Sequence, residues 1–161
     1  MASGLENLHI RRAKPEDIGD IRNLIGALGY SATAPKDMQK VLQQYISSNS
    51  LGLLIAELGV HVVGLLSYTV TPILRLGGNK MEIEELVIRE ADRNKGIGAV
   101  LLKRAREIAK ESNVRRIQIS TNPVDKLTGA ARESVARRFY VKNGFEVADR
   151  ITLRQEFERK A

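Results

Sequence analysis

Apolar residues recur along this chain in two different periods, and the changes of period divide it into helices and strands. After a proline-led acidic start at Pro15–Asp17, apolar residues follow at helical spacing up to residue 28. A second helix of this kind begins near residues 33–35. Apolar runs bounded by turn residues predict strands at 8–12, 51–57 and 61–70, the last two joined as an antiparallel hairpin.

The rest of the chain continues this mixture. A strand at 81–88 leads through a glycine-containing loop and a long amphipathic helix to a strand at 115–121, a connection that favours a parallel, right-handed unit. A helix at about 130–142 and a closing hairpin of strands at 145–149 and 151–157 follow. The pattern predicts an α/β fold on one mixed, mostly antiparallel sheet, with a parallel strand pair and helices on both faces.

Length and composition add little to this prediction. A chain of 161 residues without repeats or a linker is expected to form one domain, 1–161. No stretch approaches the roughly 20 apolar residues that span a bilayer, and the first residues lack the build of a secretory signal. We therefore expect a cytoplasmic protein with no membrane partner.

The composition excludes several kinds of chemistry. The chain has no cysteine, which removes disulfides, thiolate metal sites and a cysteine nucleophile. Its two histidines, His9 and His61, stand in no metal-binding or catalytic motif, so we predict no metal. The net charge of +7 indicates attraction to polyanions, but aromatic residues make up only 4% of the chain. A nucleic-acid-binding module is thus a weaker alternative than a small polyanionic cofactor.

The loop from Arg93 to Gly98 (RNKGIG) carries the clearest chemical signal. It opens the long helix, whose first N–H groups and positive dipole end favour an anion. Gly96 and Gly98 let the backbone approach that anion, and Arg93 and Lys95 add positive charge. A dinucleotide fingerprint would need a third glycine where Leu101 stands, and no P-loop motif occurs. A phosphate site remains, with a plain glycine turn as the alternative.

Two segments together resemble the GCN5-related N-acetyltransferase family. The first is IEELVI at 83–88 followed, four residues later, by the RNKGIG loop, which is similar to the family's Q/R-x-x-G-x-G/A motif. The second is ARRFYVKNGF at 136–145, similar to its A-x-x-F-Y-x-x-x-G-F segment. The order of elements resembles the family over nearly the whole chain. The resemblance implies a GNAT-like fold and acetyl-CoA as the acetyl donor, and it allows a homodimer.

The resemblance also implies which residues meet the cofactor. The main chain of Leu86, Val87 and Ile88 would bind the pantetheine arm as an added strand, in a gap between this strand and 115–121. The pyrophosphate would lie on the loop and the first helical turn. These residues are Arg93, Asn94, Lys95, Gly96, Ile97, Gly98 and Ala99. Many relatives carry Asn seven positions before the tyrosine of the second motif, where this chain has Glu133.

The same resemblance suggests a direct transfer of the acetyl group to a primary amine in a ternary complex. Tyr140 would donate a proton to the departing thiolate, and a carboxylate would act as the base. Glu84 is our first choice and Glu82 the second, because they share a strand face, with Glu85 pointing oppositely unless a bulge intervenes. These acids would equally serve only to attract a cationic small-molecule or peptide amine. A CoA-binding sensor without turnover is the alternative on this fold.

Overall fold

The computed structural model describes residues 4–29, 33–121, 134–148 and 153–156. The chain divides into two compact units, Met1–Ser120 and Thr121–Ala161, which we describe separately. Within the described residues, no helix has both the length and the apolar composition needed to span a membrane.

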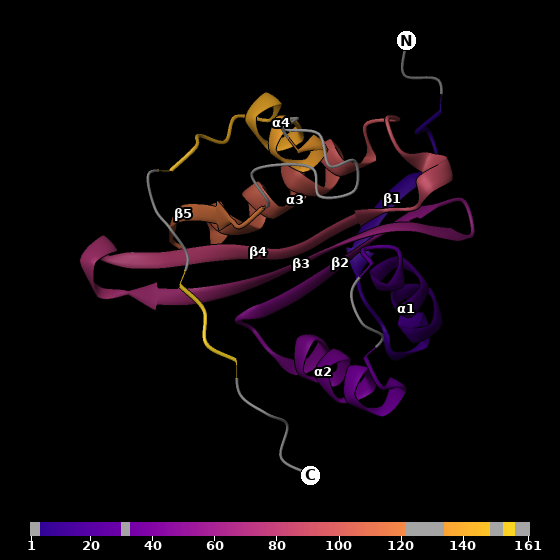
Figure 1. Cartoon of the computed structure of the whole chain (residues 1–161), viewed down its shortest axis with the longest axis horizontal. Coiled ribbons are helices and arrows are strands. Elements are labelled where there is room, and N and C mark those ends of the chain that lie inside the picture. The colour runs from indigo at the N-terminus through magenta and orange to yellow at the C-terminus, as the bar shows by residue number, and fades with distance from the viewer. Residues whose placement is uncertain (1–3, 30–32, 122–133, 149–152, 157–161) are drawn as a thin grey trace. The chain divides into compact units, whose positions relative to one another are not determined.

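The first unit is built on one five-stranded sheet whose strands follow each other in chain order. The strands are β1 (Leu8–Arg12), β2 (Leu51–Leu58), β3 (His61–Ile73), β4 (Gly78–Ile88) and β5 (Val114–Ile119). Neighbouring strands are antiparallel from β1 to β4, and only β4 and β5 run parallel (Figure 1). The predicted mixed sheet with one parallel pair is confirmed.

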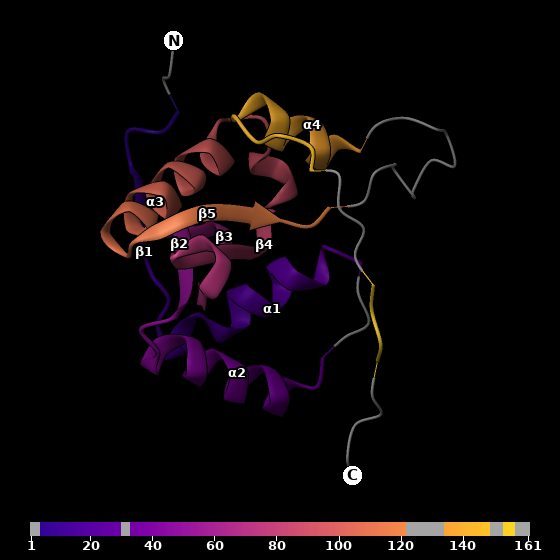
Figure 2. The same cartoon turned by 90° about the vertical axis from the view of Figure 1, so that its left-hand side faces the viewer.

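Helices cover both faces of this sheet. The helices are α1 (Ile18–Gly26), α2 (Pro35–Ser47) and α3 (Ile97–Glu111), with short 3₁₀ turns η1 (Pro15–Asp17), η2 (Leu74–Leu76) and η3 (Glu90–Asp92). Figure 2 shows α1 and α2 on one side of the sheet and α3 on the other. The parallel pair requires a crossover connection, and α3 supplies it by carrying the chain back along one face of the sheet so that β5 can align with β4.

Strand alternation divides the apolar residues between the two faces. Leu53 and Ile55 of β2, with Leu65 of β3 and Val87 of β4, pack with buried residues of α1 and α2 in one core cluster. The residues between them, such as Leu54 and Leu66, are buried on the opposite face, which α3 covers. Two apolar layers therefore hold the sheet, each matched to an amphipathic helix face.

The second unit contains α4 (Val135–Lys142), which agrees with the predicted helix over its described part. The Ser134 hydroxyl caps it by accepting the N–H of Arg137 at 3.0 Å. The predicted closing hairpin is not formed in its described residues, because 145–148 and 153–156 carry no strand. Alternation marks residues that suit a strand, but a strand also needs a hydrogen-bonded partner, which the pattern alone does not supply.

An ion network fixes the start of α1 to the sheet. The Arg11 guanidinium binds both carboxylate oxygens of Asp17 at 2.8 Å and Oε2 of Glu57 at 2.6 Å. Asp17 is buried and also accepts the Lys14 N–H at 2.7 Å. The hydrogen bonds from Arg11 hold the pKa of the Asp17 carboxyl below its usual range.

We expect Asp17→Ala to lower the free energy of unfolding by about 2–3 kcal/mol, because it leaves the Lys14 N–H without a partner and the Arg11 guanidinium with Glu57 alone. The difference from wild type should shrink as the pH falls through the lowered pKa of Asp17, since protonation removes the same interaction. Urea unfolding over a range of pH measures both effects. Glu16→Ala, at an exposed neighbouring position, is the control; an equal loss there would contradict the role of Asp17.

Candidate functional site

A β-bulge interrupts β4 halfway along its length. Ser67 of β3 lies opposite Glu85, but the next residue, Tyr68, lies opposite Ile83, so Glu84 is an extra residue without a partner position. Such a bulge bends the strand and increases its local twist. The parallel pairing of β4 with β5 ends beside it, at Ile83 and Ile119.

Beyond the bulge, β4 presents main-chain groups at an open edge. The Arg89 N–H donates to the Val63 oxygen of β3 at 2.7 Å. Every second residue of an antiparallel strand directs its N–H and C=O to the same neighbour, so Val87 also directs its main-chain groups toward β3. Leu86 and Ile88 therefore direct theirs to the opposite side. On that side, in the part of the chain that the structure describes, no strand pairs with β4 past Ile83.

The glycine-bearing loop follows this edge and ends at the N-terminus of α3. Gly96 is the N-cap with φ of 90°, in the left-handed region that disfavours a side chain. The first helical hydrogen bond runs from the Val100 N–H to the Gly96 oxygen, so the N–H groups of Ile97, Gly98 and Ala99 have no partner within the helix. An anion at this point would meet three N–H groups and the positive end of the dipole.

A buried carboxylate organises the loop cations. Asp92 accepts Lys95 Nζ at 2.8 Å and Arg89 Nε at 2.5 Å, and its side chain is 4% exposed. The hydrogen bonds from Lys95 and then Arg89 hold the pKa of the Asp92 carboxyl below its usual range. Arg93, at an exposed position, donates from Nε to the Ile88 oxygen at 3.2 Å. The charge of Lys95 is thus partly offset by Asp92, and no pattern in the sequence indicates this pair.

The bulge brings three glutamates to the face that α1 and α2 cover. Glu82 and Glu84 had been expected to share a face, and the bulge adds Glu85 to it. Glu82 binds Lys80 Nζ at 2.7 Å, and exposed Glu84 accepts the Thr69 hydroxyl at 3.3 Å. Each of the three carboxylates therefore has a different environment.

Glu85 is partly buried, and its neighbours come from elements far from it in the sequence. The Glu85 carboxylate accepts a hydrogen bond from the Ser67 hydroxyl, and the main-chain N–H of Glu85 donates to Oγ of Ser67 at 3.1 Å. Burial, and then the charge of Glu84, raises the pKa of the Glu85 carboxyl. Burial, and then the charge of Glu85, raises the pKa of the Tyr45 phenol from α2. No local motif could have linked residues this far apart.

The expected proton donor, Tyr140, lies in the second unit. Its ring is 7% exposed and meets Phe139 and Phe145 edge-on, with centroids 5.1 and 5.5 Å away. Burial raises the pKa of its phenol above the ordinary tyrosine value. Glu133 and the loop before it lie outside the described residues.

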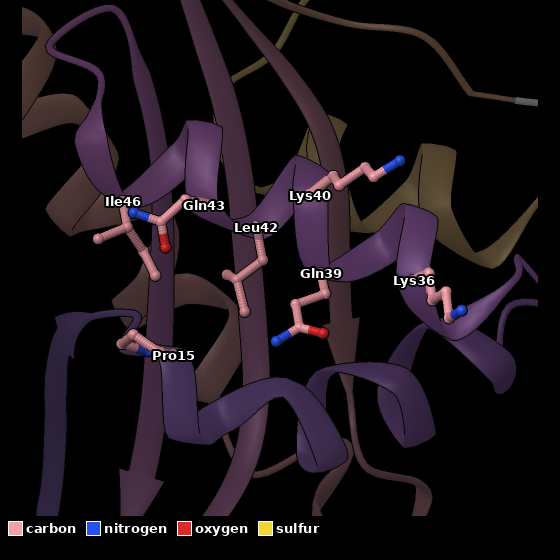
Figure 3. Close-up of a pocket in the computed structure, with 7 residues that line it drawn as sticks. All are labelled: Pro15, Lys36, Gln39, Lys40, Leu42, Gln43 and Ile46. Carbon is pink, nitrogen blue, oxygen red and sulfur yellow. The ribbon is translucent and has the colours of Figure 1, made fainter.

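A separate hollow lies between α2 and η1. It has a volume of about 400 Å³, and Figure 3 shows side chains of α2 and Pro15 around it. Its lining residues are Pro15, Lys36, Gln39, Lys40, Leu42, Gln43 and Ile46. None of the residues that the sequence assigned to cofactor or catalysis lines it.

The partial burial of Glu85 predicts that this residue lowers the stability of the folded protein at high pH. Because its folded pKa is raised, its contribution to stability is present at low pH and lost as the pH rises through that pKa. We therefore expect Glu85→Gln to raise the melting temperature relative to wild type at about pH 8 and to lose this advantage near pH 4. Thermal unfolding across this range measures it, and a difference that does not vary with pH would contradict the burial of a charged Glu85.

Comparisons with known proteins concern the family of this chain rather than the geometry of the site. The model of the acetyltransferase (GNAT) family matches residues 20–145. An uncharacterized N-acetyltransferase of Archaeoglobus fulgidus is 28% identical over 139 residues, which cover 83% of this chain and 89% of that protein.

Solved structures show the same fold. A transcriptional regulator from Bacillus halodurans C-125 superposes with a TM-score of 0.78 and 28% identity, covering 93% of this chain and 99% of that one. An aminoglycoside acetyltransferase from an uncultured soil metagenomic sample, in complex with sisomicin, has a TM-score of 0.71 and 18% identity, covering 95% and 97%. The resemblance found in the sequence is confirmed, and the chain belongs to the acetyltransferase (GNAT) family.

Proposed function

We propose that this protein is an acetyl-CoA-dependent N-acetyltransferase that acts directly on a primary amine. The observation that carries the proposal is the continuity of two features in one unit. The open main-chain edge of β4, at Leu86 and Ile88, runs into the glycine loop at the N-terminus of α3.

The residues of this edge and loop fit coenzyme A. An extended arm that contains amides can bind Leu86 and Ile88 as an added strand, with Val87 between them anchored to β3. The pyrophosphate fits the segment 93–99, where Gly96 and the first helical N–H groups form a cradle without a side chain. When bound, acetyl-CoA supplies the acetyl group as a reactive thioester.

The protein's own residues would handle the protons. We propose Tyr140 as the acid, since it is the tyrosine of the ARRFYVKNGF segment and a phenol is protonated at neutral pH, the form that a donor needs. A carboxylate of β4 serves as the base. Glu84 and Glu82 remain candidates from the sequence, and Glu85 joins them because of the bulge.

The acceptor we propose is a cationic amine. The three glutamates on one face of β4 outnumber their one lysine partner, Lys80, so this face attracts positive charge. Only the neutral amine, formed after loss of a proton, has the lone pair that attacks. The aminoglycoside acetyltransferase with the same fold was solved with sisomicin, which supports testing amino sugars first.

A CoA-binding sensor is the second candidate. The similar Bacillus halodurans protein is described as a transcriptional regulator, and this chain carries a net charge of +7. A sensor would bind CoA without consuming acetyl-CoA. A nucleic-acid-binding module would show salt-dependent DNA or RNA binding that CoA does not affect.

We expect the protein to release CoA thiol from acetyl-CoA when an amine acceptor is present. A panel of amino sugars, polyamines, amino acids and peptides, followed with a thiol reagent, tests this. CoA alone should raise the melting temperature, because it binds the folded state. CoA binding without thiol release from any amine would favour the sensor. The absence of both CoA binding and thiol release would overturn the proposal.

We expect Gly96→Ala to weaken CoA binding about tenfold, because a Cβ at φ of 90° costs about 1–2 kcal/mol and displaces the N–H groups. Isothermal titration with CoA measures the affinity. Gly77→Ala is the matched control, since Gly77 also has positive φ, at 57°, but lies at the far end of β4. It should reduce stability to a similar degree and leave CoA affinity unchanged; equal weakening in both variants would contradict the cradle.

We expect Tyr140→Phe to lower kcat about 10²-fold while KM for acetyl-CoA changes little, because the variant keeps the ring and loses only the hydroxyl that donates the proton. Steady-state kinetics with an amine that wild type turns over measures this. Tyr68→Phe, which removes a different buried phenol, is expected to keep its activity. Full activity in Tyr140→Phe would exclude Tyr140 as the acid.

A further inference from the structure

Ser67 and Glu85 form a closed pair across β3 and β4 at the bulge. Ser67 is 3% exposed, and one hydroxyl makes both contacts: it donates to Oε2 of Glu85 and accepts the Glu85 N–H. A serine hydroxyl has one donor and two acceptor positions, so both bonds can exist together. The same side chain thus fixes the main chain and the carboxylate of Glu85.

The other two glutamates of β4 are not held in this way. Glu82 is neutralised by Lys80, and Glu84 is exposed with a single long contact from Thr69. A carboxylate that is to take a proton needs a fixed position and a partner that does not cancel its charge. A neutral hydroxyl meets both requirements, whereas an ammonium group does not.

The surroundings of Glu85 contain few other charges. Glu84 is its neighbour on β4, Tyr45 faces it from α2, and Ser67 faces it from β3. The pair of Lys80 and Glu82 lies further along the same face. From α1, the buried or partly buried residues Ile21, Leu24 and Ile25 enter the core, while Asp20 and Arg22 are exposed.

We infer that Glu85 is the carboxylate that accepts a proton from the acceptor ammonium, and that Ser67 is the positioning residue that holds it for this step. The inference rests on the proposed acetyl transfer. Glu85 takes one proton from the ammonium group, which leaves a neutral amine with a free lone pair, and later releases that proton to water. Ser67 keeps its own proton throughout and acts only through Glu85.

The pH dependence of kcat distinguishes this role from a structural one. Ser67→Ala should lower kcat at neutral pH about tenfold and move the acidic limb of the profile to higher pH, because the ionised carboxylate loses its donor. KM for acetyl-CoA should not change. Glu85→Gln should lower kcat about 10²-fold and should show no acidic limb in its pH profile. Ser67→Thr keeps a hydroxyl and should keep the limb near its wild-type position.

Thr69→Val is the matched control, because it removes the hydroxyl that contacts Glu84 from the next position on the same face of β3. It should leave the limb in place. An unmoved limb in a folded Ser67→Ala protein, or an equal shift in Thr69→Val, would overturn the inference.

A second measurement needs neither substrate nor turnover. In protein with ¹³C-labelled glutamate, the carboxyl signal that is missing in Glu85→Gln identifies Glu85. We expect it to titrate above the range of an ordinary glutamate, and higher still in Ser67→Ala. Titration at the ordinary position in wild type would overturn the inference. If wild type consumes no acetyl-CoA with any amine, the proposed function fails, and the titration still reports on Ser67 and Glu85.

Discussion

The extra residue in β4 is the constraint on which the site depends. A strand in the middle of a sheet normally satisfies its main chain on both sides. The bulge at Glu84 changes the direction of β4, and pairing with β5 ends there, at Ile83, while pairing with β3 continues to Ile88. One inserted residue therefore accompanies both the open main-chain edge and the gathering of three glutamates on one face.

The glycine loop meets a different constraint, that of holding several cations close together. Arg89, Arg93 and Lys95 lie within seven residues and would repel one another. Buried Asp92 offsets this repulsion by binding two of them, and Arg93 is turned toward the end of β4. The loop is thus held in shape by side chains, while its main-chain N–H groups at the start of α3 stay available to an anion.

The sequence predicted the elements better than the contacts between them. The apolar periods located all five strands and the helices of the first unit, because each element buries one regular face. The bulge could not be placed, since Glu84 and Glu85 are both polar and the pattern does not tell which is extra. Tyr45, Ser67 and Glu85 escaped notice as a group because the strand register and α2 bring them together. The described residues of the predicted closing hairpin carry no strand, for the related reason that alternation does not identify a partner strand.

The order of the sheet has a consequence for how the chain can assemble. Because the strands stand in the same order in space as in sequence, no strand has to insert between two others that are already paired. β1 to β4 can join in the order in which a ribosome delivers them, and β2 to β4 do so through connections of only a few residues. The last pairing, of β5 with β4, must wait for the whole of α3. Until α3 has been made, β4 is therefore the edge strand of the growing sheet, and this strand carries the edge that the proposed cofactor site would use.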